Sequence, residues 1–434
     1  MEPTLGGAVG AGHRPVSKVY AWTVFALTFG LMLSDYLTRN VISAVFPLLK
    51  VEWSLSDRQL GSLVSVVALI VGVASFPIAL LADRWGRVKS ITAMAAMWCI
   101  ATIGCGLAQS HTQMLVARGF VGLGEAGYGS AGGAILAHVF PPERRAAIFG
   151  AFLAAALFGS VAGVALGGII ATHHGWRAAF IGVGAASLIL VVLYPLIVRD
   201  YETVALVTED GKGPMGIVGI VKALFAVRTA VFTYLGSGFQ MFIMGVLSAW
   251  IPAYFGRYYG LAPDVAAVRA ALVILVAGVG MIVGGGIVDR LGQKDRRNRL
   301  RVPAAYAVIT FALLTSAFLL PPGPAQLALI FGGVFLAGGH SGAAGAVITD
   351  VIHPGLRATA LAVIVLGNNL LGLAPGPVLV GALSDSFGLQ SAMAVAPAFC
   401  LLAAVCFLIG SRHYARDSSH FAEPQDAQSR ALVA

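Results

Sequence analysis

Charged side chains are scarce in this chain. Asp, Glu, Lys and Arg make up only 11% of the 434 residues, whereas 58% of the residues are hydrophobic. An ordinary soluble domain carries about 25% charged residues, so this balance excludes that class. The composition predicts a protein that crosses a membrane many times.

Cysteine is also rare, and the chain has no cluster of residues typical of an enzyme. The four cysteines lie in apolar stretches without metal-ligand neighbours, and no nucleophile triad or phosphate-binding loop stands in its required context. We therefore expect no enzymatic activity, no disulfide framework, no metal and no cofactor. The net charge of +9 could suggest nucleic-acid binding, but the basic residues lie in short segments next to apolar runs, where membrane topology accounts for them.

Long apolar runs dominate the sequence. A helix crosses a ~30 Å hydrocarbon core with about 20 residues, and the chain divides into twelve runs of suitable length. The fold class that this predicts is an all-α polytopic membrane protein. The expected spans are 19–49, 59–82, 89–109, 112–139, 145–172, 177–198, 228–256, 265–288, 302–320, 326–349, 357–384 and 389–411.

The basic residues indicate the orientation. Of the 28 Lys and Arg residues, 21 fall in the two tails and in the even-numbered connections, and basic segments stay in the cytoplasm. The segment before Tyr20 lacks the cleavage site of a signal peptide. We expect both termini to be cytoplasmic and the protein to reside in a bacterial inner membrane.

The chain is expected to consist of two similar halves. Residues 200–214 form the longest hydrophilic interruption, and sequence matches at offsets of 206, 212 and 213 residues relate the two sides. Such repeats are typical of transporters that rock around a site at mid-membrane. The predicted organisation is an N-terminal tail (1–18), a six-helix bundle (19–199), a linker (200–227), a second six-helix bundle (228–411) and a C-terminal tail (412–434).

The stretch FPIALLADRWGRVKS resembles the loop signature of the major facilitator superfamily. Its signature residues are Asp83, Arg84, Gly86 and Arg87, and GGGIVDRLGQK supplies a weaker copy that contains Asp289 and Arg290. The resemblance implies the twelve-helix major facilitator fold and a gating role for these residues at the cytoplasmic helix ends. The alternative is that the basic residues only fix topology.

A narrower resemblance concerns the first and fourth spans. The stretch RGFVGLGEA, from Arg118 to Ala126, resembles the corresponding part of Spinster-like transporters and their bacterial relatives, and Tyr36, Arg39 and Pro47 also match that pattern. Thr38 stands where those proteins have an acid, and Asp35 lies one helical turn earlier. The anion:cation symporter branch is similar in the same places. The first resemblance implies a lysolipid or sphingoid substrate, and the second a small carboxylate.

Four charged residues stand inside these apolar spans: Asp35, Arg39, Arg118 and Glu125. A lone charge at a helix centre costs about 2.5–3.5 kcal/mol on insertion scales. We expect a cluster in which Arg39 pairs with Glu125 and Arg118 lies near Asp35, with the two acids carrying the coupled proton and the two arginines binding an anionic substrate. The alternative is a fixed structural salt-bridge network.

Further substrate contacts are expected from polar residues of both halves, and in the second half they replace the four charges, which have no counterpart there. These candidates are Tyr36, Tyr128, Tyr234, Gln240, His340, Asn368 and Asn369.

Together these features predict a monomeric secondary active transporter that is coupled to protons. We expect its partners to be the lipid bilayer, protons, and an organic anion or anionic amphiphile, either lysolipid-like or a carboxylate, moved by symport or antiport. The alternatives are a passive facilitator of a small organic solute and a non-transporting membrane sensor.

Overall fold

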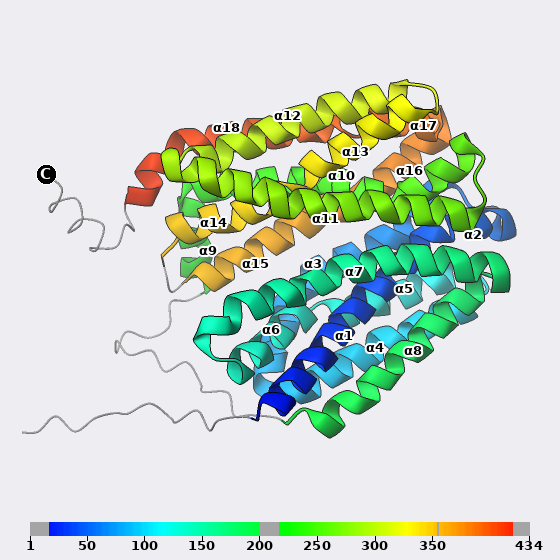
Figure 1. Cartoon of the computed structure of the whole chain (residues 1–434), viewed down its shortest axis with the longest axis horizontal. Coiled ribbons are helices and arrows are strands. Elements are labelled where there is room, and N and C mark those ends of the chain that lie inside the picture. Colours follow the sequence, from blue (N-terminus) through cyan, green and yellow to red (C-terminus); the bar gives the residue numbers. More distant parts are fainter. Residues whose placement is uncertain (1–16, 200–216, 354–355, 420–434) are drawn as a thin grey trace, which may run out of the picture.

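Two helical bundles lie side by side in this molecule (Figure 1). The computed structural model describes residues 17–199, 217–353 and 356–419, which contain helices and no strand. Most of both predicted tails and of the predicted linker lie outside these ranges. The side chains of Asp83 and Arg84 also lie outside the described part of the chain.

The first bundle is formed by the helices before the predicted linker. They are α1 (Lys18–Ala44), the short α2 (Phe46–Trp53), α3 (Asp57–Trp85), α4 (Arg87–Leu107), α5 (His111–Glu125), α6 (Tyr128–Val139), α7 (Pro142–His174) and α8 (Trp176–Ile197).

The second bundle follows the linker. Its elements are α9 (Ile217–Ala226), α10 (Arg228–Tyr259), α11 (Pro263–Lys294), α12 (Asn298–Leu319), α13 (Pro324–Gly338), α14 (Ser341–Val351), α15 (Arg357–Gly367), the π-helix η2 (Asn368–Leu373), α16 (Pro375–Phe387), α17 (Leu389–Val395) and α18 (Ala398–Ser419).

The predicted all-α, twelve-span architecture is confirmed. Within the described ranges, ten helical segments are long and apolar enough to cross a membrane. The other two spans are α1 and the α5–α6 pair, which hold the four charged residues that make them less apolar. Several bounds differ from expectation. The predicted first span divides into α1 and α2, α9 is a helix inside the predicted linker, and α11 and α18 continue past residues 288 and 411 to Lys294 and Ser419.

The repeat is visible in the way two spans are interrupted. The fourth span breaks between α5 and α6 at Ala126 and Gly127, and the tenth breaks between α13 and α14 at Gly339 and His340. These are equivalent positions in the two halves. Glu125 is the last residue of α5, so the break places its carboxyl beside a turn in the middle of the span.

The bundles contact each other along α3 with α16 and along α7 with α11. Glycines allow these helices to approach closely: a Cβ on Gly61 would lie 2.3 Å from the Pro377 oxygen, and one on Gly168 would lie 2.2 Å from the Ala267 Cβ. These contacts lie toward the end of the molecule that carries α2, opposite the end where α1 begins and α18 ends (Figure 1). We call this the α2 end.

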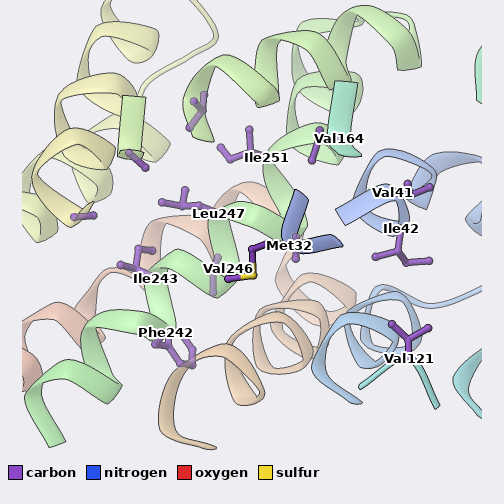
Figure 2. Packing of buried hydrophobic residues seen from close by; sticks show 14 of the residues in the cluster. Met32, Val41, Ile42, Val121, Val164, Phe242, Ile243, Val246, Leu247 and Ile251 are labelled. Atoms are coloured by element: carbon purple, nitrogen blue, oxygen red, sulfur yellow. The ribbon is translucent and has the colours of Figure 1, made fainter. Parts of the chain in front are cut away.

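Buried hydrophobic side chains of α1 and α10 meet where these two helices contact each other. Figure 2 shows Met32 of α1 beside Val246 of α10, and both are buried. This packing joins the two bundles at the depth of the charged residues described next.

Candidate functional site

The four membrane-embedded charges meet inside the first bundle. Asp35 and Arg39 stand one turn apart on α1, and Arg118 and Glu125 stand two turns apart on α5. Asp35, Glu125 and Arg118 are buried, with 6%, 6% and 1% of their surfaces exposed. The Arg39 side chain is 20% exposed, so this guanidinium is the most accessible of the four charges.

Arg39 forms the ion pair that the sequence predicts. Its Nη1 lies 3.7 Å from Glu125 Oε2, within ion-pair range but beyond hydrogen-bond distance. The same guanidinium lies 5.9 Å from the centre of the Tyr36 ring. The pair therefore joins α1 to α5 without strong hydrogen bonds.

Arg118 makes different contacts from those expected. Its Nε donates to the Leu63 oxygen at 3.0 Å and its Nη2 to the Arg39 oxygen at 3.1 Å, whereas the charged neighbours of the Asp35 carboxyl are Glu125 and Arg39. A planar guanidinium can serve acceptors in two directions. Arg118 thus ties α5 to the main chains of α3 and α1 and holds the turn that carries Arg39.

Three carboxyl oxygens of the two acids have no hydrogen-bond donor in the described part of the chain. They are Asp35 Oδ1 and both Glu125 oxygens, and all three are buried. A buried polar group without a partner is costly, and two neighbouring carboxylates repel each other. A proton shared by the pair would supply a donor and remove one negative charge.

A cavity of about 290 Å³ lies between the bundles and is bordered by Arg39. The first bundle lines it mainly with polar groups, and Ser43 and Ser160 join Tyr36, Arg39 and Asn40 there. The second bundle contributes Ser248 and an apolar wall that includes Met241, Met244, Leu247, Ile251, Ile274 and Leu373.

Of the predicted substrate contacts, Tyr36 and Arg39 line this cavity. Tyr128 instead donates to the Thr28 oxygen at 2.6 Å and packs against Trp98. It is fully buried. These contacts place Tyr128 in the packing between α6, α1 and α4.

The candidates of the second bundle are buried within or between helices, except Asn368, which is half-buried. Asn368 Oδ1 accepts from Ser237, and the Asn369 amide donates to the Val365 oxygen. His340 Nδ1 lies 2.9 Å from the Ala337 oxygen. Several of their polar atoms have no hydrogen-bond partner: the Tyr234 hydroxyl, both amide atoms of Gln240, His340 Nε2 and Asn369 Oδ1. None of these side chains is among the described residues that line the cavity.

The predicted gating residues can be placed only in part. Gly86 joins α3 to α4 with φ +95°, a conformation that favours glycine. Arg87 begins α4 and is half-buried, whereas Asp289 and Arg290 near the end of α11 are exposed. The Asp83 and Arg84 side chains lie outside the described residues, so their gating role stays a prediction.

Sequence reasoning missed the remaining polar residues of the cavity and a dense ionic cluster at the α2 end. Asn40 follows Tyr36 by one turn on α1, and its amide contacts Ser160 at 3.3 Å. Uncharged polar residues in apolar spans are common, so periodicity alone does not single these two out. The ionic cluster involves residues at helix ends, where charges also serve topology.

The Major Facilitator Superfamily model matches residues 28–374 of the chain. An MFS-type efflux pump of Mycolicibacterium smegmatis is 28% identical over 413 residues, which cover 92% of this chain and 94% of the relative. Probable sphingolipid transporter spinster homolog 1 of Arabidopsis thaliana is 26% identical over 389 residues, with 83% and 78% coverage.

A solved structure gives the same picture of the fold. A bacterial homolog to the human lysosomal transporter Spinster, in an inward-facing and unoccupied conformation, matches with a TM-score of 0.83 at 23% identity. The match covers 93% of this chain and 99% of that one. The family resemblance expected from the loop signature and from the first and fourth spans is confirmed.

Proposed function

The chain belongs to the Major Facilitator Superfamily of membrane transporters, and from this premise we propose that it couples protons to the transport of an organic anion with an apolar body. The observation that carries this proposal is the under-paired cluster beside the cavity. Arg39 borders the cavity, and its partner Glu125 lies 3.7 Å away next to a second acid.

The charge of the cluster links the binding of the proton to the binding of the organic anion. With Asp35 and Glu125 ionised, the two arginines are neutralised and an additional anion gains little. Protonating one acid leaves a net positive charge, and Arg39 is the group placed to use it, because a guanidinium binds carboxylate or phosphate through paired hydrogen bonds. Proton and anion therefore favour each other's binding.

The cavity walls support an amphiphilic substrate. An anionic head would lie against Arg39, Asn40 and Ser160, while an apolar body would contact Met241 and Met244 across the cavity. Methionine adapts its shape to different apolar ligands. A strongly hydrated carboxylate would lose water on the apolar side without replacement, so we favour an amphiphile over a small polar acid.

Proton binding can be tested without knowing the substrate. Protein in proteoliposomes on a solid-supported membrane should give a transient charge movement when the pH is stepped from 7.5 to 5.5. We expect Glu125→Gln and Asp35→Asn to reduce this charge at least about tenfold, since each removes a member of the proton-binding pair. Glu52→Gln is the matched control because Glu52 is a carboxylate on α2 that pairs with Arg177. An unchanged charge movement in both cluster variants would reject proton binding by Asp35 and Glu125. The four charges would then form only a fixed structural salt-bridge network.

The substrate class needs a separate test. We expect decanoate and lysophosphatidate to raise the unfolding temperature of protein in nanodiscs, more at pH 5.5 than at pH 7.5, and gluconate to have little effect. Arg39→Gln should abolish the shift. Stabilisation by gluconate alone would overturn the amphiphile proposal but would leave proton coupling intact.

A further inference from the structure

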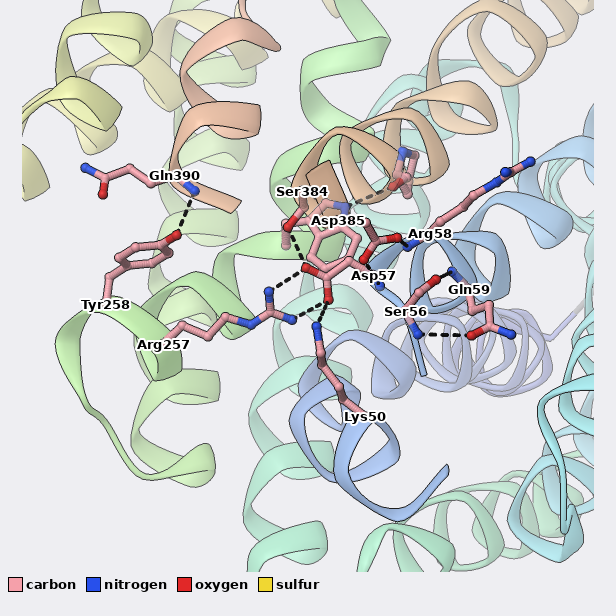
Figure 3. A network of polar contacts seen from close by, with 12 residues as sticks. Lys50, Ser56, Asp57, Arg58, Gln59, Arg257, Tyr258, Ser384, Asp385 and Gln390 are labelled. Carbon is pink, nitrogen blue, oxygen red and sulfur yellow. Dashed lines mark hydrogen bonds and ion pairs between the residues drawn. The ribbon is translucent and has the colours of Figure 1, made fainter. Parts of the chain in front are cut away.

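A network of charged side chains closes the α2 end, away from the site described above (Figure 3). Its centre is Asp57, the first residue of α3, whose side chain is only 2% exposed. Arg257 of α10 donates to both Asp57 oxygens at 2.5 and 2.6 Å, and Lys50 of α2 donates to Oδ1 at 2.5 Å. Ser384 of α16 donates to Oδ2 at 2.5 Å.

These partners belong to different bundles. Lys50 and Asp57 are both in the first bundle, whereas Arg257 and Ser384 are in the second. When the bundles separate at this end, the Lys50 contact can persist. The paired hydrogen bonds from Arg257 must break.

A second carboxylate, on the second bundle, accepts hydrogen bonds from the first bundle. Asp385 of α16 accepts from the backbone N–H groups of Asp57 and Arg58 at 2.7 and 3.0 Å. The first N–H groups of a helix have no partner within the helix, and the positive end of the helix dipole favours an anion. Asp385 therefore caps α3 from the other bundle.

An aromatic contact lies beside the ionic network. Phe46 of α2 and Trp250 of α10 are fully buried, with ring centres 5.3 Å apart. Trp250 Nε1 donates to the Pro377 oxygen at 3.0 Å, and the Arg257 guanidinium lies 5.9 Å from its ring. The aromatic pair thus joins the two bundles next to the ionic network.

The network stands between the cavity and the α2 end. Pro252 lines the central cavity and also a smaller pocket of about 200 Å³ that includes Arg257 and Pro47. The smaller pocket thus adjoins the central cavity on one side and, through Arg257, the ionic network around Asp57 on the other.

We propose that Asp57 and Arg257 form a lock that holds the α2 end closed, with Asp385 as a cap across the same interface and Lys50 as a partner that stays with Asp57 in both states. The lock concerns the transport cycle and does not depend on which ligand or proton is moved. Arg257 contributes mainly to the closed state, because its contact with Asp57 crosses the interface. Lys50 contributes to both states and has little influence on the balance between them.

The test is access to the cavity from the α2 end. Ser43 lines the cavity and is 2% exposed, so Ser43→Cys is a suitable reporter once the four native cysteines are replaced by alanine. A membrane-impermeant maleimide is added to the side of the vesicles that carries the α2 end. Right-side-out and inside-out vesicles make this possible for either orientation of the chain.

Arg257→Gln and Asp57→Asn should raise the labelling rate of this reporter at least about tenfold, because each removes the paired charge contact across the interface. Arg257→Lys, which keeps the charge, should stay closer to the parent rate. Lys50→Gln and Glu52→Gln should change it less than twofold. Arg257 is partly exposed, so its substitution tests the lock even if the Asp57 variant does not fold.

Two outcomes would overturn the lock. One is unchanged labelling in Arg257→Gln protein that elutes as a single folded species. The other is an equal rise in Lys50→Gln and Arg257→Gln, which would assign the whole cluster to the stability of the closed fold and give no special role to the contact between bundles.

Discussion

Asp57 and Glu125 are both buried acids, yet their surroundings differ in almost every respect. Asp57 accepts hydrogen bonds from Arg257, Lys50 and Ser384 at 2.5–2.6 Å. Glu125 has Arg39 at 3.7 Å and, among the described residues, no hydrogen-bond donor on either oxygen. The first arrangement holds one ionised form in place. The second leaves a buried carboxyl without donors, and this is an acid for which we propose proton coupling, so the degree of pairing is the difference that the following experiments test.

The largest stability difference should come from neutralising each acid in turn. Asp57→Asn is expected to lower the free energy of unfolding by about 1–3 kcal/mol, because several donors lose their acceptor. Glu125→Gln is expected to leave stability unchanged or to raise it, since it removes a buried charge that lacks hydrogen bonds while Asp35 and partial exposure still accommodate the charge of Arg39.

Thermal unfolding of the two purified variants at pH 7.5 checks this contrast. An equal loss of stability in both variants would show that Glu125 is as firmly paired as Asp57. The proposed difference between the two acids would then be wrong.

A smaller effect, on the labelling rate of the cavity reporter, should follow from adding a side chain at the glycine that contacts Asp57. A Cβ on Gly381 would lie 2.4 Å from the Asp57 main-chain oxygen, whereas one on Gly285 of α11 meets nothing within 4 Å. Gly381→Ala must push α16 away from α3, and we expect labelling of the cavity reporter to rise about threefold. Gly285→Ala is the matched control. If the two alanine variants label alike, close packing at this crossing does not keep the α2 end shut.

The smallest expected effect is on the stability of the fold when Glu52, the exposed acid of α2, is replaced. Burial is the largest single influence and raises its pKa, but the hydrogen bonds from Trp176 and Arg177 and the charge of Arg177 together outweigh it and hold the pKa below its ordinary value. A lowered pKa means that the pair stabilises the fold above the ordinary Glu range and that this contribution disappears as the pH falls through the lowered pKa.

Glu52→Gln should therefore cost less than about 1 kcal/mol at pH 7, with the difference from wild type vanishing in strong acid. Unfolding temperatures measured between pH 3 and pH 7 give the profile. A difference that grew on acidification would contradict the sign of the shift.

Much of the architecture was predictable because bilayer thickness and helix rise act on every span alike. The twelve apolar runs, the repeat and the position of Asp35, Arg39, Arg118 and Glu125 inside apolar spans follow from local composition and periodicity. The pairing of Arg39 with Glu125 was also accessible, because opposite charges at matching depths in one bundle have few other partners.

Other contacts were beyond the reach of sequence patterns. The Arg118 guanidinium donates hydrogen bonds to the main-chain oxygens of Leu63 and Arg39. Every residue has a main-chain oxygen, so the sequence does not indicate which one accepts. Gln240 and His340 are as polar as Asn40, but only Asn40 reaches the cavity. Which face of a helix meets the cavity depends on its rotation against its neighbours.

The sequence by itself determined that this chain spans a membrane with twelve helices in two related halves, and that its first bundle carries two acids and two bases inside its spans. The tertiary structure decided which of those charges touch, which walls form the cavity, and that Asp57 meets Arg257 and Asp385 at the α2 end. The physical reason is that hydrophobic burial and helix periodicity act over a few turns of one helix. A contact between bundles depends on how two rigid bodies dock, and side chains far apart in the chain settle that together.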